Sequence, residues 1–251
     1  MSTFHWPRFR RVFLNDLQQQ WRKIWISSLA LAGVVLVAYL TNLDPHLGAR
    51  PEIYAALFPA ILLGAGLPFT STIFSDLHHP LQRFHYLTLP CSNLERFVSR
   101  YLLTGPLLIL YAFIAYAAFD FIASVIATGL TGRSAAPFAP LDPRIVEMTS
   151  SYVQLHALML LGAIFFRSYS LPKTLIAGAV IGFGLVAVQL ITVRLVFWEY
   201  FATIIPSESV QAVRLLIVPM PLVAGLMTLL YLWVLYVAYQ CLREHEVQGE
   251  L

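Results

Sequence analysis

One polar stretch of the chain, Phe74–Arg100, carries side chains that are spaced to interact with one another. It reads FSDLHHPLQRFHYLTLPCSNLERFVSR and lies between two strongly apolar segments. After Pro90, Ser92 and Glu95 form the capping-box pattern, in which each residue's side chain accepts a hydrogen bond from the other's backbone N–H. The pattern predicts a helix that starts at Ser92 and continues into the next apolar segment. Leu77–Leu87 predicts a short surface helix before it; an ordinary interhelical loop is the alternative.

No arrangement of residues in the sequence is typical of an active site. The P-loop, G-x-S-x-G and H-E-x-x-H patterns do not occur, and no acidic residues are paired for catalysis. His78, His79 and His85 lie near one another, but Asp76 is the only Cys, Asp or Glu at ligand spacing from them. We expect these histidines to contact lipid headgroups or a partner protein rather than a metal. We therefore expect no enzymatic activity, metal or cofactor in this chain.

The composition of the chain is that of a membrane protein. Of the 251 residues, 59% are hydrophobic and only 12% are charged, whereas a soluble domain is about 25% charged. Long apolar segments with so little charge predict an all-α, polytopic membrane protein. The net charge of +3 is small and comes mostly from the N-terminus, so it gives no indication of nucleic-acid binding. Six segments are predicted to span the membrane: Ile24–Leu40, Ile53–Phe74, Tyr101–Ile126, Tyr152–Phe166, Thr174–Val193 and Leu222–Tyr239.

Residues 1–23 are predicted to form an interfacial helix, separate from the six-span domain of residues 24–251. Phe9, Phe13, Leu17 and Trp21 recur every four residues, and basic and amide side chains occupy the other faces of the helix. An amphipathic helix of this kind lies at the headgroup level of an anionic membrane. We therefore expect membrane lipid to be one partner of the chain.

The Lys and Arg residues are divided unequally between the two sides of the predicted membrane domain. Eleven of the sixteen lie on the side that holds both termini and the 75–100 loop, and five lie on the other. Because cytoplasmic loops carry the excess of Lys and Arg, we expect a multi-pass protein of the cytoplasmic (inner) membrane with both termini in the cytoplasm. Cys91 and Cys241 then share the reducing side, where a structural disulfide is not expected.

The connection before the last predicted span, residues 195–221, is too apolar for a free loop. Leu195–Ile205 is apolar and aromatic, Pro206 interrupts it, and a further helical segment, Ser209–Val218, follows. A re-entrant or interfacial hairpin on the outer side fits these features. A long fifth helix with an aromatic belt is the alternative.

Several polar residues fall within or near the predicted spans, where polar groups are costly and often functional. Two of them, Asp120 and Arg194, either pair near the outer surface or extend separately to the interface. The others either line a translocation path or form hydrogen bonds between helices. Gly178 and Gly182 form a G-x-x-x-G pattern that favours close helix packing, within one subunit or between two. The polar set consists of Asp120, Gln154, His156, Gln189 and Arg194.

The order of an apolar span, a short polar helix, the motif LP-x-S-x-x-E-R and another apolar span resembles the permease subunits of ABC-2-type transporters. The motif here is Leu89–Arg96. The resemblance covers nearly the whole chain as a layout, but as a residue motif it covers only this piece. It implies an N-terminal interfacial helix, a cytoplasmic coupling helix in the 75–100 loop, and re-entrant helices between the fifth and sixth spans. It also implies a permease dimer around a central path.

This resemblance implies that the chain is the membrane-spanning permease subunit of an ATP-driven transporter, and we expect an exporter. ATP and Mg²⁺ would bind to a separate ATPase subunit, present as a dimer, and a second permease subunit would complete a homo- or heterodimer. A non-transporting membrane anchor or assembly subunit is the alternative; an intramembrane enzyme is disfavoured because no nucleophile, metal site or acid–base set is present. The residues expected to couple the chain to the ATPase are Asp76, Arg83, Ser92, Glu95 and Arg96.

Overall fold

The computed structural model of the chain describes residues 4–41, 43–44, 48–49, 51–78, 91–132, 138–196 and 220–247. Six helical segments within these ranges are long and apolar enough to span a membrane, so the chain is a multi-pass helical membrane protein, as the sequence predicts. Residues 197–219, which hold most of the predicted outer hairpin, and residues 79–90 of the predicted coupling loop lie outside the described ranges.

The described elements are helices, apart from a β-hairpin of two two-residue strands between the first two long helices. The hairpin is antiparallel, with Leu43 opposite Ala49. In chain order the elements are α1 (Trp6–Thr41), β1 (Leu43–Asp44), β2 (Gly48–Ala49), α2 (Pro51–Thr72), α3 (Ser75–His78), α5 (Asn93–Thr104), α6 (Pro106–Thr131), α7 (Pro143–Phe165), α8 (Ser170–Val196) and α11 (Met220–Val247).

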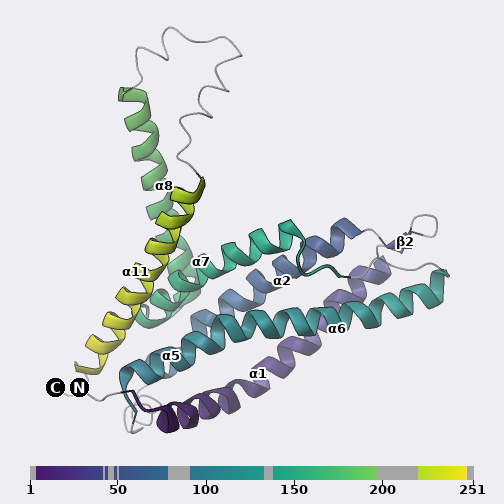
Figure 1. Cartoon of the computed structure of the whole chain (residues 1–251), viewed down its shortest axis with the longest axis horizontal. Helices are drawn as coiled ribbons and strands as arrows, with labels where there is room; N and C mark the ends of the chain where they lie inside the picture. The colour runs from purple at the N-terminus through teal and green to yellow at the C-terminus, as the bar shows by residue number, and fades with distance from the viewer. Residues whose placement is uncertain are drawn as a thin grey trace.

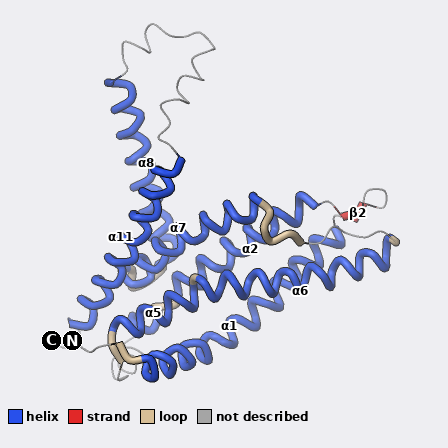
Figure 2. The backbone as a smooth tube through the Cα atoms, viewed as in Figure 1, coloured by secondary structure: helices blue, strands red, loops and turns tan. Residues whose placement is uncertain are grey.

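The long helices form a bundle from which the last two diverge. Figure 1 shows α1, α2, α6 and α7 lying side by side, with α5 leading into α6. α7 is the central element, because it packs against α2, α8 and α11, while α1 packs against α5 and α6. α8 and the first part of α11 project away from the other helices, whereas the second half of α11 packs against α5 and α7 (Figure 2). The start of α1 and the end of α11 lie at the same end of the molecule, as an even number of spans requires.

Two hydrophobic clusters hold the bundle together. The first lies between α1, α2, α6 and α7, where the ring of Phe58 stacks on Phe113 at 4.5 Å between centroids and meets Tyr116 edge-on at 5.4 Å. The second joins α2, α3, α5, α7 and α11, and its fully buried members include Phe74, Leu160 and Leu242. This second cluster packs beneath the charged residues that are described below.

Two glycines bring α7 close to its neighbours. A Cβ atom added at Gly162 would overlap the side chain of Thr174 on α8, and one added at Gly66 would lie 2.7 Å from the ring of Tyr152. Close approach of backbones at small residues is a usual way to pack membrane helices, because lipid supplies no hydrophobic drive for their association. The α7–α8 and α2–α7 contacts therefore depend on these two positions.

The outer faces of the helices are strongly apolar. Phe121, Phe183 and Trp233 are each more than 60% exposed. In the most apolar segment of α8, only 6% of the residues are buried within the chain. In water such surfaces would be unfavourable, but in a bilayer the hydrocarbon of the lipid covers them. The exposed surface of α8 and α11 is therefore a membrane-facing surface.

Two boundaries differ from those expected from the sequence. α1 continues without interruption through residue 23, so the predicted division between an interfacial helix and the first span is a change in composition and not a break in the helix. α7 begins at Pro143, nine residues before Tyr152 and close to the Ile145 region from which the sequence predicts that the fourth span extends; Asp142 caps it by accepting from the Arg144 N–H at 2.8 Å. A proline in the first turn and an N-terminal aspartate are common at helix starts.

Candidate functional site

The predicted capping box is present at the start of α5. The Glu95 N–H donates to the Ser92 hydroxyl at 3.2 Å, and the Ser92 N–H donates to the Glu95 carboxylate at 3.0 Å. Both residues are buried, so the reciprocal bonds satisfy groups that water does not reach. The helix begins at Asn93, where the sequence places it, and this prediction is confirmed.

Glu95 also binds the beginning of the chain. Its carboxylate accepts from the His5 backbone N–H at 2.7 Å and lies 3.6 Å from the Arg8 guanidinium. The side chain of Glu95 is fully buried, whereas that of Arg8 is 38% exposed. One carboxylate therefore fixes both the start of α5 and the start of α1.

Arg100 closes the base of the predicted coupling loop. Its guanidinium donates to the Ile73 carbonyl at 2.6 Å and to the Asp76 carboxylate at 3.2 Å. It also lies over the ring of Phe74, 4.9 Å from the centroid, in a cation–π contact. Residues 73–76 lie at the start of the 75–100 loop and Arg100 lies at its end, so one side chain holds both ends of the loop together.

Four further side chains complete this group. The Ser99 hydroxyl donates to the Asp16 carboxylate at 2.6 Å, and this bond joins α5 to the N-terminal third of α1. The Nε of Arg96 donates to the Cys91 thiol at 2.9 Å, and burial raises the pKa of that thiol. The charged cluster consists of Asp16, Asp76, Glu95, Arg96 and Arg100, of which all but Asp76 are at most 8% exposed.

The burial of this charged cluster is costly unless each charge is paired. Removing a carboxylate or guanidinium from water costs several kcal/mol, and only good partners offset it. The chain has only 29 Asp, Glu, Lys and Arg residues, and four of them are the buried members of the charged cluster. Such concentration of buried charge in a membrane protein indicates a site with a specific role.

A second group of polar side chains continues inward from the charged cluster. The Thr104 hydroxyl donates to the Arg100 carbonyl at 2.8 Å and is also 2.8 Å from Nε2 of His156. The Tyr152 hydroxyl donates to the Thr104 carbonyl at 2.8 Å and lies 3.4 Å from the hydroxyl of Thr70. These bonds connect α2, α5 and α7 through fully buried groups.

Two tyrosines extend this group to the last helix. The hydroxyls of Tyr101 on α5 and Tyr231 on α11 are 3.0 Å apart. The ring of His156 lies between Tyr101 and Tyr152, at centroid distances of 5.7 and 5.9 Å. We call the whole group the polar column; its members are Thr70, Tyr101, Thr104, Tyr152, His156 and Tyr231.

The helix break between α5 and α6 lies against the polar column. Gly105 separates the two helices with backbone angles outside the helical region, and Pro106 begins α6. A Cβ at Gly105 would lie 3.1 Å from Cε1 of His156, which leaves little room for any other residue. Because proline has no N–H and restricts the preceding residue, the break is fixed by the sequence at this point.

The other predicted site residues do not join these two groups. Asp120 is buried just past the middle of α6, where its carboxylate accepts from the Phe138 N–H at 3.2 Å and anchors the connection to α7. Gln154 is exposed on α7, and Arg194 is exposed in the last turn of α8. The side chains of Arg83 and Gln189 lie outside the described residues.

The predicted packing role of Gly178 and Gly182 is not fulfilled among the described residues. A Cβ at either position would meet no atom within 4 Å. Both glycines are on α8, whose apolar surface faces away from the bundle. The alternative in which they pack between two subunits stays a prediction.

Sequence reasoning missed Asp16, Ser99 and Arg100 as site residues, and it missed the tyrosines of the polar column. Asp16 carried a usable signal: it is an acidic residue three positions after Phe13 and one before Leu17, on the apolar stripe of an amphipathic helix. A charge on that face requires a buried partner. The hydroxyl of Ser99 carries no comparable signal in the sequence.

The two groups are joined through α5. Among the described residues, no three His, Cys, Asp or Glu side chains are grouped to hold a metal ion. His78 uses Nε2 to bind the Ala163 carbonyl at 3.0 Å, which attaches α3 to the end of α7. The contacts instead form a continuous hydrogen-bonded connection from the charged cluster to the interior of the bundle.

Comparisons of the chain with protein-family models, with curated proteins and with solved structures found no match.

Proposed function

We propose that the chain is the permease subunit of an ABC-2-type transporter, an exporter driven by ATP hydrolysis on a separate ATPase subunit. In this proposal the ATPase docks on the Ser75–Arg100 loop at the cytoplasmic end of the bundle. Two permease subunits form the path between them, and the energy for movement of the substrate arrives through this contact.

The observation that carries the proposal is the way in which Arg100 holds both ends of the loop. A force applied to the loop acts on Asp76 and Ile73 at one end and on α5 at the other, through one buried guanidinium. An ordinary exposed loop has no such connection and would absorb the force by bending. A loop with a rigid, charged base is what a coupling element requires.

The force has a defined route into the membrane. Arg100 and Thr104 are one helical turn apart and are joined by the bond from the Thr104 hydroxyl to the Arg100 carbonyl. Thr104 also contacts His156 in the centre of α7, beside the break at Gly105. Tilting α5 about this break would therefore move α7, the helix that contacts α2, α8 and α11.

The test is reconstitution of the tagged chain with a candidate P-loop ATPase subunit, in nanodiscs, with complex formation and ATP hydrolysis measured together. We expect Arg83→Glu to weaken ATPase binding about tenfold, which corresponds to about 1.4 kcal/mol. Arg167→Glu is the matched control: it reverses the same charge on an exposed residue in the turn between α7 and α8, on the same predicted side. The control is expected to bind the ATPase as the wild type does.

A loop-replacement variant tests the loop itself. Replacement of residues 79–90 with a Gly/Ser linker keeps Asp76, the buried Leu77 and the capping box, so we expect the fold to be retained and ATPase binding to be lost. Equal binding by this variant and the wild type would disprove the coupling assignment. If no ATPase binds the wild type, the permease proposal fails and the membrane-anchor alternative takes its place.

A further inference from the structure

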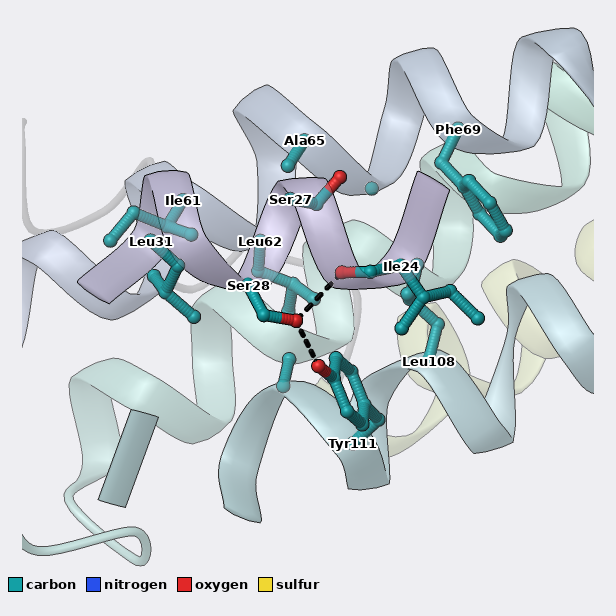
Figure 3. A pocket seen from close by; sticks show the side chains of 12 residues that line it. Ile24, Ser27, Ser28, Leu31, Ile61, Leu62, Ala65, Phe69, Leu108 and Tyr111 are labelled. Atoms are coloured by element: carbon teal, nitrogen blue, oxygen red, sulfur yellow. Dashed lines mark hydrogen bonds between the residues drawn. The ribbon is translucent and has the colours of Figure 1, made fainter. Parts of the chain in front are cut away.

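A cavity opens on the membrane-facing side of the bundle, away from both polar groups. It lies between α1, α2 and α6 and has a volume of about 70 Å³. Its lining is almost wholly apolar, and Figure 3 shows aliphatic side chains from the three helices pointing into it. The residues used below are Ser27, Ser28, Leu31, Leu62, Ala65 and Tyr111.

The few polar atoms at the cavity already have partners. The Ser28 hydroxyl donates to the Ile24 carbonyl at 2.6 Å and is also hydrogen-bonded to the Tyr111 hydroxyl, as the dashed lines in Figure 3 show. A buried water needs two to four polar partners, and an apolar cavity without them stays dry or takes an apolar occupant. This cavity therefore fits a hydrocarbon ligand better than water or a polar solute.

The position of the cavity along α1 relates it to the membrane surface. Trp21 and Trp25 are exposed and lie edge to face at 5.8 Å, the kind of aromatic pair that marks the headgroup level. From Ile24 to the end of α1 at Thr41 are 18 residues, or about 27 Å of helix, close to the thickness of the hydrocarbon core. The cavity lining begins at Ile24, between Trp21 and Trp25 in the chain, and therefore at the headgroup end of this hydrocarbon-spanning part of α1.

Two cations directly precede the cavity-lining residues along α1. Arg22 and Lys23 are both exposed, and Lys23, Ser27 and Leu31 follow one another at four-residue intervals on the same face of α1. Helical side chains lean toward the N-terminus, so the Lys23 ammonium extends from the cavity toward the surface. A ligand with an apolar tail in the cavity would have its head beside these charges.

We propose that the cavity binds part of one acyl chain of an anionic glycerophospholipid, with the lipid phosphate held by Lys23 and Arg22. At about 10–15 Å³ of cavity per water-sized group, the volume accommodates about five to seven methylene groups, or part of one chain. Each cation near a membrane surface raises the affinity for anionic lipid by about fivefold. The site is independent of the proposed transport function, since none of its residues belongs to the charged cluster or the polar column.

Photocrosslinking in nanodiscs tests the site, with a trace of either phosphatidylglycerol or phosphatidylcholine that carries a diazirine on one acyl chain. We expect mass spectrometry to find the phosphatidylglycerol probe on peptides that contain Leu31 and Leu62, at several times the level on the exposed peptides of α8. We expect the phosphatidylcholine probe to label these peptides several-fold less. Equal labelling by the two probes, or no preference for these peptides over α8, overturns the proposal.

Two variants and one control separate occupancy of the cavity from general contact with lipid. Ala65→Leu places a larger side chain in the cavity from an exposed position at its rim, and Ala117→Leu makes the same change on an exposed face of α6 outside the cavity. We expect the first to abolish labelling and the second to leave it unchanged. Lys23→Gln, a substitution of an exposed residue, is expected to reduce labelling by phosphatidylglycerol about fivefold, since Arg22 keeps its own contribution. Full labelling of Ala65→Leu or of Lys23→Gln contradicts the proposal.

Discussion

Replacement of Arg100 is expected to destabilise the protein much more than replacement of its partner Asp76. Arg100→Met keeps a long apolar stem but removes the bond to the Ile73 carbonyl, the ion pair with Asp76 and the cation–π contact with Phe74. Asp76→Asn removes only the charge of a side chain that is 29% exposed, while the arginine side chain is 4% exposed. The two variants therefore remove different numbers of contacts from the same buried group.

The expected cost follows from these contacts. A hydrogen bond from a charged group to a carbonyl contributes about 1.5–3 kcal/mol, and a desolvated cation–π contact contributes about 1–2 kcal/mol. The ion pair with the partly exposed Asp76 contributes about 1 kcal/mol at most, because water screens it. The sum predicts a loss of about 2.5–6 kcal/mol for Arg100→Met and about 1 kcal/mol for Asp76→Asn, in which the arginine keeps two of its three partners.

The measurement is reversible unfolding of the purified protein in mixed micelles, followed by circular dichroism, for both single variants and the double variant. The double-mutant cycle should give a coupling energy of about 1 kcal/mol. If Asp76→Asn costs as much as Arg100→Met, the arginine is held by the charge of Asp76 alone, and the role assigned to the Ile73 carbonyl and the Phe74 ring is wrong.

Two other predictions concern packing and topology. Gly162→Ala is expected to destabilise the protein by about 1–3 kcal/mol, because the new Cβ overlaps Thr174 and forces α7 and α8 apart. Gly33→Ala is the control: a Cβ there meets no atom within 4 Å, so it should stabilise the protein by up to about 1 kcal/mol in the same unfolding assay. Equal effects of the two substitutions would contradict the close approach of α7 and α8 at Gly162. Cys91 and Cys241 should react with an impermeant maleimide only after the cells are permeabilised, and labelling of Cys91 in intact cells would refute the orientation. Since burial raises the pKa of the Cys91 thiol, its labelling rate should still rise above pH 8.5, where the rate for an ordinary thiol begins to level off.

What the sequence predicted well is what depends on neighbouring residues. The capping box involves four consecutive positions, so its geometry follows from local preferences alone. The six spans follow from long apolar segments, which a bilayer requires to be helical. The break at Gly105–Pro106 also has a local cause in the proline ring, but it was not predicted, because the third span was expected to be one segment, Tyr101–Ile126.

What the sequence did not predict depends on which face of a helix is buried. Gln154 and His156 are both polar and two residues apart, hence about 200° apart around α7. One is exposed and the other is buried against Thr104. Because α7 has apolar residues on all sides of this segment, no pattern in the sequence indicates which face meets α5. The partners of Arg100 and Asp16 are likewise set by tertiary contacts, 24 and 83 residues away along the chain.

The anchoring of α1 by α5 has a consequence for biosynthesis. The His5 N–H and Asp16 reach Glu95 and Ser99 across sequence separations of 90 and 83 residues. At about 5–20 residues per second of synthesis, the ribosome needs roughly 4–20 s to produce those partners after the first helix has emerged. Throughout that interval the apolar stripe of the nascent helix has no α5 to cover it, and an amphipathic segment in that state adsorbs to the membrane surface. The interfacial location that the sequence predicts for residues 1–23 thus applies to the nascent chain before α1 has packed against α5.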